Sequence, residues 1–567
     1  MHVVTNHVRQ GEREYSSTLL RRSYREDGKV KKETLANLSH LPPEVIELIR
    51  GALRGVRYMP ADEAFAIERS LPAGHVGAAL AMARRLELPR LIDRQPSRQR
   101  DLVMAMICQR VICPASKLAT ARLFSLSTLA DEFSVAGADE DELYGALDWL
   151  TERQAKIEDR LARRHLKDGE LVLYDVSSSY FEGRRCPLAK LGYSRDGKRG
   201  TPQIIYGLLC DRAGRPVSVE VFDGNLHDNA TVPAQIEKLR QRFSLSTVVL
   251  VCDRGMVTKA NIELLGEGGV GFITALKAPQ VAKLAGDGEL QLSLFDQQNL
   301  AEITSVDYPG ERLIVCRNPL VAAERSRKRV ELLAATEHGL SQIAARVGSG
   351  TLFGAAQIGL AVGAVANHYK VKKHLDIQIT DTTLSFSRKH AQIEAEAALD
   401  GFYILRTSVR ENELSTADVV RSYKLLAQVE RGFRTFKGPE LEIRPIHHRL
   451  EERVRAHVFL CMLAYYLTWH LRAAWTPLLF TDEDPSPSPD PVAKATRSPS
   501  ALTKAQTKRS PTGEPLHSYK SLLAELATLT RNTIRLPGTH ATFDKLSEPT
   551  AVQTRALELV ENAPVIA

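Results

Sequence analysis

The stretch LVLYDVSSSYFEG, residues 171–183, begins the part of the chain that decides the fold. Its apolar run leads to Asp175, and a second run, TVVLVCDRG at residues 247–255, leads to Asp253 in the same way. Continuous apolar runs of this length are typical of strands buried inside a parallel or mixed sheet. Because polar, turn-forming residues follow each aspartate, we expect Asp175 and Asp253 to close their strands.

Further strands and helices alternate around these two segments. Strand-like stretches occupy residues 201–211, 215–225 and 271–277, and helical patterns occupy residues 232–243 and 259–268. This alternation predicts a mixed α/β sheet. Ligands of such sheets gather beyond the carboxyl ends of the strands, so two aspartates placed there can share a cation. The alternative is that each aspartate is an ordinary turn former.

A third acid, Glu430, lies on a long helix predicted over residues 414–437. Tyr423, Glu430 and Lys437 follow one another at intervals of seven residues, with Arg434 four residues after Glu430. At about 100° per residue, seven steps return to nearly the same side of a helix, so these side chains share a face. A surface ion pair between Glu430 and Arg434 is the competing explanation.

Together the three carboxylates form a set of hard oxygen ligands suited to Mg²⁺, or to Mn²⁺ as a substitute. Two such ions roughly 3.5–4 Å apart activate the attacking oxygen and stabilise the leaving oxygen in phosphodiester transfer. Cations beside the acids would neutralise the phosphates of the substrate. This chemistry points to a nucleic acid backbone.

Four motifs carry a family resemblance over residues 171–466. They are LYDVSSSYFEG at 173–183, GNLHDNAT at 224–231, VVLVCDRGM at 248–256 and the block YKLLAQVERGFRTFKGPELEIRPIHHRLEERVRAHVFLCMLAYYL at 423–467. The chain resembles the DDE transposases of the bacterial insertion-sequence-four superfamily, and in particular its 1634 branch. The last block is the most specific of the four.

The resemblance implies an RNase H-like catalytic core interrupted by a β-rich insertion, with a helical N-terminal domain and a helical C-terminal region. It implies that Asp175, Asp253 and Glu430 bind two Mg²⁺ ions, and that Tyr423 and Lys437 hold DNA near the cleaved end. The implied reaction is hydrolytic nicking, attack of the freed 3′-hydroxyl on the other strand to give a hairpin, reopening, and insertion into target DNA.

One position departs from the family's helix signature, Y-x2-R-x3-E-x6-K, because Leu426 stands where the signature has arginine. One phosphate contact is then either missing or supplied by Lys424, Arg431 or Arg434. The candidate DNA contacts are Tyr423, Arg431, Arg434, Lys437, Arg444, His447 and Arg449. The candidates for a supporting shell around the acids are Asn225, Asp228 and Arg254, for which a plain turn is the alternative. The turn bearing Lys190, Arg195, Lys198 and Arg199 fits a DNA clamp or a solvated hairpin equally.

The chain is expected to divide at changes of composition and pattern. The expected segments are residues 1–60, mixed and basic; 61–167, a helical domain that binds DNA or is a bundle with solvated charges; 168–280, the first part of the core; 281–400, an insertion subdomain; 401–475, the second part of the core with the helix of Glu430; 476–516, a disordered linker rich in Pro, Ser, Thr and Lys; and 517–567, a helical tail.

Composition agrees with a soluble protein that has a polyanionic partner. Of 567 residues 43% are hydrophobic and 25% charged, and the net charge is +8. The seven cysteines form no CxxC pair, and no signal peptide or membrane span is recognisable, so we expect a reduced, cytoplasmic protein.

The expected partners are double-stranded DNA, both the inverted repeats at the ends of its own element and target DNA, and a second copy of the chain in the synaptic complex. Two alternatives to an active transposase remain. One is a stand-alone RNase H-like metal nuclease, and the other is a catalytically decayed DNA-binding protein.

Overall fold

The computed structural model describes residues 1–11, 13–59, 65–267, 269–482, 485, 488–536 and 540–564, which form two compact units. The first unit comprises Met1–Leu71 and Thr530–Ser547, and the second comprises Pro72–Leu529 and Glu548–Ala567. The boundary expected between residues 60 and 61 lies outside the described residues.

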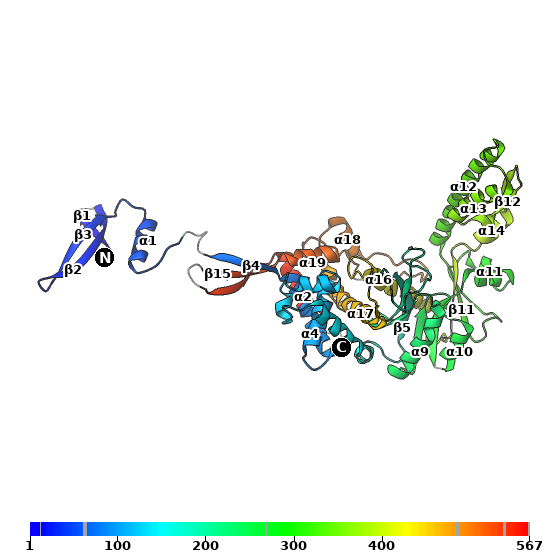
Figure 1. Ribbon diagram of the computed structural model, residues 1–567, viewed down its shortest axis with the longest axis horizontal. Coiled ribbons are helices and arrows are strands. Elements are labelled where there is room, and N and C mark those ends of the chain that lie inside the picture. The colour runs from blue at the N-terminus through cyan, green and yellow to red at the C-terminus, as the bar shows by residue number, and fades with distance from the viewer. Residues whose placement is uncertain are drawn as a thin grey trace. The chain divides into compact units, whose positions relative to one another are not determined.

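The first unit contains two small antiparallel sheets (Figure 1). One sheet is formed by β1 (His2–Gln10), β2 (Arg13–Glu26) and β3 (Lys29–Asn37), and α1 (Pro43–Leu53) packs on it through a hydrogen bond of 2.8 Å from Arg50 to the Thr5 hydroxyl. The other joins β4 (Ala66–Pro72) to β15 (Thr530–Arg535) and β16 (Thr542–Leu546). The expectation of a purely helical C-terminal tail is therefore wrong, because part of it forms a hairpin that pairs with β4.

The helical segment of the second unit packs around one buried helix, α17 (Glu451–Ala474). Sixteen residues of α17 are buried, which explains why its sequence is apolar on all sides. The helices α2, α4 and α7 contact it directly. The bounds of this helical segment are α2 (Gly74–Arg85), α3 (Leu88–Ile92), α4 (Arg98–Ile112), α5 (Lys117–Phe124), α6 (Leu129–Glu132), α7 (Glu140–Thr151) and α8 (Gln154–His165).

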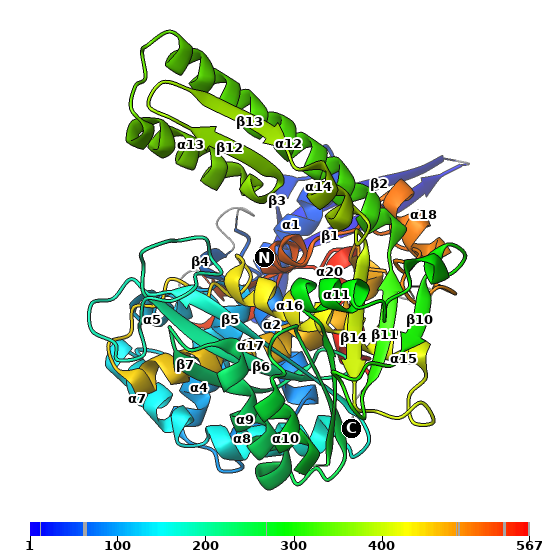
Figure 2. The ribbon, with the colours of Figure 1, turned by 90° about the vertical axis from the view of Figure 1, so that its right-hand side faces the viewer.

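An eight-stranded mixed sheet forms the centre of the second unit, with the order β10-β11-β14-β9-β8-β5-β6-β7 (Figure 2). Its strands are β5 (Leu171–Tyr180), β6 (Gln203–Asp211), β7 (Pro216–Asp223), β8 (Val248–Cys252), β9 (Val270–Ala275), β10 (Leu300–Ile303), β11 (Arg312–Arg317) and β14 (Phe402–Thr407). β5, β8 and β9 are parallel neighbours, and the other adjacent pairs are antiparallel. The expected mixed α/β sheet is confirmed.

The first strand does not end at Asp175 as expected. β5 continues to Tyr180, because its pairing with β6 extends from Val172 to Tyr180. Only its parallel pairing with β8 stops at Tyr174, which is opposite Cys252. Asp175 therefore lies where β8 ends, in the middle of its own strand, while Asp253 directly follows β8 as expected.

The long helix expected over residues 414–437 is two helices, α15 (Thr416–Lys424) and α16 (Leu426–Lys437). At the junction the Leu425 amide donates to the Ser422 carbonyl over 3.1 Å, and the Gln428 amide donates to the Leu425 carbonyl over 2.8 Å. These three-residue hydrogen bonds tighten the turn without any Gly or Pro in the sequence. The ends agree with expectation, because the Ser415 hydroxyl caps α15 and α16 stops before Gly438.

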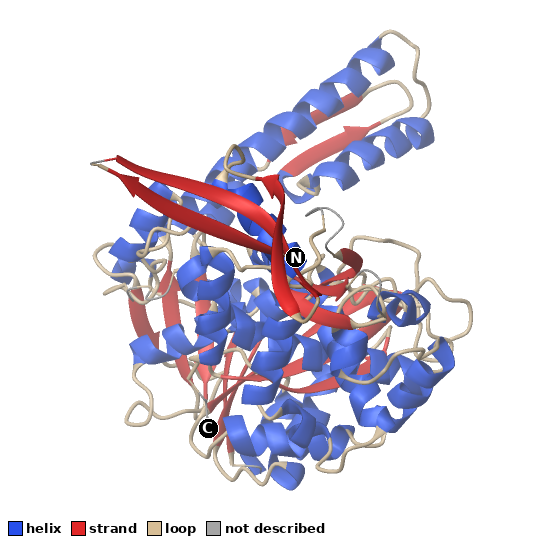
Figure 3. Cartoon of the chain, turned by 90° about the vertical axis from the view of Figure 1, so that its left-hand side faces the viewer, coloured by secondary structure: helices blue, strands red, loops and turns tan. Residues whose placement is uncertain are grey.

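The insertion between β11 and β14 is mainly helical, so the expectation of a β-rich insertion is wrong. It consists of α12 (Pro319–Gly348), α13 (Ala355–Tyr369), η4 (Lys372–His374), the hairpin β12 (Leu375–Ile379) and β13 (Leu384–Arg388), and α14 (His390–Ala397). Its hairpin lies between helices (Figure 3), and its core is separate and contains Leu333, Leu340 and Ile358. The helical period of α12 outweighs the β propensity of the short hairpin.

The segment expected to be a disordered linker, residues 476–516, has ordered structure where it is described. It contains η5 (Thr476–Leu478) and α18 (Pro499–Thr507), and Val492 is 1% exposed. The Lys424 ammonium donates to the carbonyls of Val492, over 3.0 Å, and Ala493, over 2.6 Å. Composition alone predicts disorder here because it does not show these tertiary hydrogen bonds.

The remaining elements connect the sheet strands and complete the C-terminal region. They are η1 (Asp228–Thr231), α9 (Val232–Glu237), η2 (Lys238–Arg242), α10 (Lys259–Glu267), α11 (Ala278–Gly286), η3 (Leu292–Phe295), α19 (Tyr519–Ala527) and α20 (Ala551–Glu561). Within the described ranges no single helix is long and apolar enough to cross a membrane, although the bent pair α4 and α5 meets that test of length and composition.

Candidate active site

The three predicted acids line one cavity. Asp175 and Asp253 follow residues that are paired between the parallel strands β5 and β8, and α16, which carries Glu430, packs against β5. Two adjoining pockets each include all three acids in their lining. The sheet and the helix thus bring together residues that are far apart in the sequence.

None of the three acids forms an ion pair with a described cation, although several cations line the same cavity. In particular, Glu430 and Arg434 do not form the surface ion pair that competed with a functional role for Glu430. Burial, followed by the negative charges of Asp253 and Glu430, raises the pKa of Asp175 to about 7. The three acids therefore place negative charge close together, and none of them forms an ion pair with a described cation.

Two hydrogen bonds orient Asp253. Its Oδ1 accepts from the Arg254 amide over 2.7 Å and from the Tyr423 hydroxyl over 3.3 Å. Burial, and then the charge of Asp253, raise the pKa of Tyr423, so this hydroxyl remains a donor. Tyr423 therefore contacts an acid of the cavity directly.

The donor chemistry of the cavity suits a hard divalent cation, because three carboxylates without an ion-pair partner among the described residues supply its preferred oxygen ligands. Among the described residues, however, no group of three or more His, Cys, Asp or Glu side chains is placed so that it could hold a metal ion. The acids share a cavity, and Asp175 is the one held within a strand of the sheet.

Two of the predicted DNA contacts, Lys437 and Arg444, converge on an acid that sequence reasoning missed. Asp196 is 1% exposed and forms ion pairs with Lys437 Nζ at 3.0 Å and Arg444 Nη1 at 2.5 Å. All three residues line the same pocket as the acids. Asp196 gave no signal, since it lies in a glycine-rich polar loop whose composition indicates only a turn.

The other predicted DNA contacts divide into two groups. Arg434 is exposed and lines the acid cavity. Arg431, Arg449 and His447 are exposed and do not line it; His447 Nε2 lies 3.8 Å from a Glu182 carboxylate oxygen. The structure therefore brings Tyr423, Arg434, Lys437 and Arg444 to the cavity, but not Arg431, His447 or Arg449.

The predicted supporting residues are also separated. Asp228 lines the cavity, where its two carboxylate oxygens accept hydrogen bonds from Arg195 over 2.6 and 2.7 Å. Asn225 and Arg254 are exposed and do not line it, although the Arg254 amide orients Asp253. Leu426, at the position of the signature arginine, lines the pocket beside Lys424, whose ammonium is occupied by the carbonyls of Val492 and Ala493.

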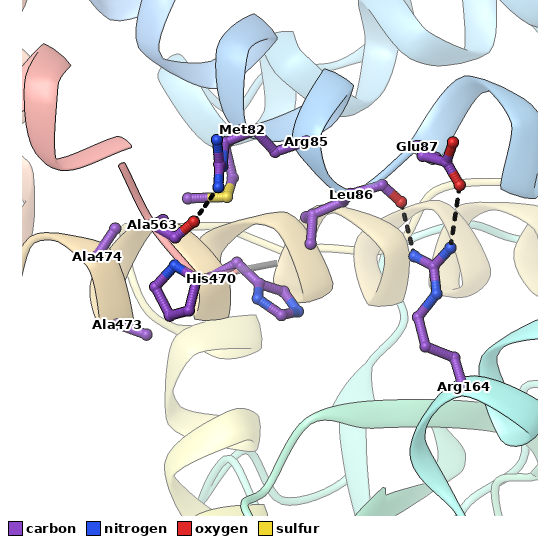
Figure 4. A pocket seen from close by; sticks show the side chains of 10 residues that line it. Met82, Arg85, Leu86, Glu87, Arg164, His470, Ala473, Ala474 and Ala563 are labelled. Carbon is purple, nitrogen blue, oxygen red and sulfur yellow. Dashed lines mark hydrogen bonds and ion pairs between the residues drawn. The ribbon is translucent and has the colours of Figure 1, made fainter. Parts of the chain in front are cut away.

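A separate pocket lies between α2, α17 and the C-terminal residues (Figure 4) and contains none of the three acids. Its charged groups are satisfied internally: Arg164 donates to the Leu86 carbonyl over 2.6 Å and pairs with Glu87 at 3.9 Å, and Arg85 donates to the Ala563 carbonyl. This pocket offers no set of reactive groups, so the acid cavity is the candidate active site.

Comparison with known proteins identifies the family of the chain. A family model described as a transposase DDE domain matches residues 167–467, and one described as the N-terminal domain of IS1634 family transposases matches residues 2–63. No curated protein matches. Among solved structures, a cryo-EM structure of a piggyBac transposase synaptic complex with hairpin DNA is similar over 79% of each chain, with 10% identity and a TM-score of 0.35. Since the DDE model covers more than half of the 567 residues, the chain belongs to the DDE transposase family, in its IS1634 branch, and is an insertion-sequence transposase.

Proposed function

We propose that this transposase cuts and joins DNA with two divalent ions, Mg²⁺ or substituting Mn²⁺, held by Asp175, Asp253 and Glu430. The observation that carries the proposal is a shared cavity lined by three acids from separate elements, none paired with a protein cation. Strand order supports an RNase H-like core, because β7, β6 and β5 are antiparallel neighbours and β8 and β9 continue parallel to β5.

The bound ions would activate the attacking oxygen and stabilise the leaving oxygen of a phosphodiester. The protein side chains orient the metal-binding acids and neutralise the phosphates of the substrate. Tyr423 fixes Asp253 by its hydrogen bond, while Arg434, Lys437 and Arg444 face the same cavity and bind the phosphates that flank the cleaved bond. The nick leaves a 3′-hydroxyl, which then attacks the opposite strand to give a hairpin before reopening and insertion.

The substrates in this proposal are the terminal inverted repeats of the chain's own element and a target duplex. A homodimer would hold two ends together in the synaptic complex. The helical segment 61–167, with basic residues between its apolar positions, and the matched N-terminal segment would contribute DNA contacts outside the cavity. The hydrolytic core is formed by the segments 168–317 and 402–475, because β10 and β11 belong to the central sheet, and the insertion between β11 and β14 separates them.

Three isosteric variants test the proposal: Asp175→Asn, Asp253→Asn and Glu430→Gln. We expect each variant to reduce Mg²⁺-dependent cleavage of a duplex that carries the element's end below detection. Its affinity for that duplex should stay within about threefold of wild type, because the substitution removes no cation that contacts a phosphate. Asp287→Asn, an exposed acid outside both pockets, is the matched control and should cleave normally.

Three results would contradict the proposal or favour an alternative. Normal cleavage by all three variants would refute the metal assignment. Cleavage without any strand-transfer product would favour the stand-alone nuclease, and no cleavage by the wild-type chain with its own ends would favour the decayed DNA-binding protein.

A further inference from the structure

Opposite charges share the cavity of the acids without neutralising one another. Asp175, Asp253 and Glu430 have no ion-pair partner among the described residues, while Arg195, Arg434, Lys437 and Arg444 line the same pocket. Cations and carboxylates in one cavity attract each other strongly, because the local dielectric constant is lower than that of water. Other residues must therefore keep these cations from pairing with the three acids.

Asp196 does this for two of the cations. Its buried carboxylate forms ion pairs through Oδ1 with Lys437 from the last turn of α16 and with Arg444 from the loop after it. Its Oδ2 accepts a hydrogen bond from the Tyr180 amide over 3.2 Å at the end of β5. Three separate segments thus meet at one carboxylate. The neighbouring residue, Arg195, is taken by Asp228 in the same way.

One carboxylate cannot satisfy two cations fully. Lys437 has three N–H donors and Arg444 has five, so several donors stay available after the pairs with Asp196 are formed. Lys437, Arg444 and Asp196 together carry a net charge of +1. Lys437 remains 13% exposed and Arg444 30% exposed, so both can be reached from the cavity.

We infer that Asp196 is a positioning residue: it holds Lys437 and Arg444 together as a fork for one DNA phosphate and keeps both cations away from the metal-binding acids. The inference rests on the proposed function, since it needs DNA in this cavity. Asp196 touches neither metal nor DNA in this role. It acts only through the two side chains that it fixes.

The test separates positioning from affinity. In Asp196→Asn, Lys437 and Arg444 lose the carboxylate that positions them. The protein surface that faces DNA also loses one negative charge. We therefore expect the dissociation constant for a fluorescent end-bearing duplex, measured with EDTA so that no cleavage occurs, to stay unchanged or fall by up to about tenfold, with a steeper salt dependence. Single-turnover cleavage with Mg²⁺ at saturating DNA should fall at least about tenfold. Asp196→Glu should recover part of that rate.

Two controls frame the result. Lys437→Gln should weaken binding and flatten the salt dependence, the opposite sign from Asp196→Asn. Asp400→Asn removes a similarly buried acid, paired with Arg329 at 2.6 Å in the insertion, and should change neither measurement. If Asp196→Asn does not fold, the double variant Asp196→Asn with Arg444→Gln removes the surplus charge, and we expect wild-type affinity with slow cleavage.

Parallel losses of affinity and cleavage in Asp196→Asn would show a merely structural carboxylate and overturn the inference. Cleavage at the wild-type rate would overturn it as well. If that happens while Asp253→Asn is inactive, the inference fails and the proposed function stands. If Asp253→Asn also cleaves normally, the proposed function fails with it.

Discussion

Arg434 and Arg431 are three residues apart on α16 and have different surroundings. Arg434 lines the acid cavity and forms no ion pair with a described acid, whereas Arg431 lies outside both pockets and its charge acts on Tyr465 of α17. We predict that Arg434→Gln slows end cleavage about 10–100-fold, since a charge-assisted hydrogen bond contributes about 1.5–3 kcal/mol. Arg431→Gln is the matched control and should stay within about threefold. If Arg434→Gln and Arg431→Gln slowed cleavage equally, Arg434 would not be the residue that replaces the signature arginine.

Buried histidines make the free energy of unfolding depend on pH, and His165 illustrates the direction of that dependence. It is 5% exposed, its Nε2 lies 2.9 Å from the Tyr466 hydroxyl, and burial lowers its pKa to about 3. An unfolded histidine has a pKa of about 6.5, so below that pH the unfolded chain binds a proton that the folded chain refuses, and stability falls as pH falls. We predict that His165→Gln loses about 2 kcal/mol less than wild type between pH 7 and pH 5 in urea unfolding. If the variant and the wild type lost the same stability between pH 7 and pH 5, His165 would be charged in the folded protein.

Single residues also show how far sequence reasoning reaches. Local rules for strand ends and helix faces predict that Asp175, Asp253 and Glu430 share a cavity, and they do, although Asp175 lies within its strand and not at its end. Asp196 was missed because its role depends on Lys437 and Arg444, which fold onto it from more than two hundred residues away. Glu430 and Arg434 have the spacing of a helical ion pair, yet the cavity leaves them unpaired among the described residues. Spacing predicts which residues share a face, whereas partner choice needs the tertiary structure.

At the scale of elements, the segment 488–498 was expected to be disordered and instead lies against the core. Asn299 Nδ2 donates to Asp490 over 2.8 Å, and Lys424 donates to two carbonyls of the segment. We predict that Lys424→Met lowers hydrogen-exchange protection of the amides at 490–495 about tenfold or more, since charge-assisted hydrogen bonds are lost. Arg421→Met, an exposed change on the same helix, should leave these amides unaffected. Equal protection in both variants would mean that Val492 packing alone holds the segment.

Local patterns predicted the type of most elements but not their partners. The alternation of strands and helices in 171–277 gave the mixed sheet, and the Ser415 cap and the Gly438 stop gave the ends of α15 and α16. The break at Leu425 has no residue signal, because it arises from three-residue hydrogen bonds among ordinary helix formers. The family resemblance implies a β-rich insertion, whereas this chain has a helix of 30 residues there. Hydrophobic periodicity over a long segment is the stronger signal.

At the scale of the whole molecule, long-range strand pairing escaped prediction. β4 pairs with β15, which lies more than four hundred residues later in the chain, so the first unit is built from both ends of the sequence. A single sequence contains no signal for such a pairing, because each strand alone is compatible with many partners. The N-terminal unit consequently cannot be cut out at a boundary near residue 60 without removing strands from its second sheet.

The β1–β3 sheet of that unit has two faces of different charge. Arg21 and Arg25 alternate onto one face of β2, and Lys32 of β3 joins them opposite Ser23. None of these three cations forms an ion pair with a described acid. On the other face, Arg22 pairs with Glu33 at 3.0 Å and Lys31 pairs with Glu26, and α1 covers the Thr5 side through Arg50. The first face therefore carries three cations that have no ion-pair partner among the described residues, which suits a phosphate backbone.

We predict that replacing Arg21, Arg25 and Lys32 by glutamine in the full chain weakens end-duplex binding and lowers its salt slope. Each phosphate contact contributes about 0.9 to the slope of log K against log salt, so three lost contacts reduce it by about 2–3. The matched variant replaces Arg22, Lys29 and Lys31 on the other face, with the same change of charge. Because two of those cations already pair with acids, its slope should change by about 1 or less. Fluorescence anisotropy across a salt series measures both. Identical slopes for the two variants would show that the sheet acts only through net charge, and that neither face contacts the duplex.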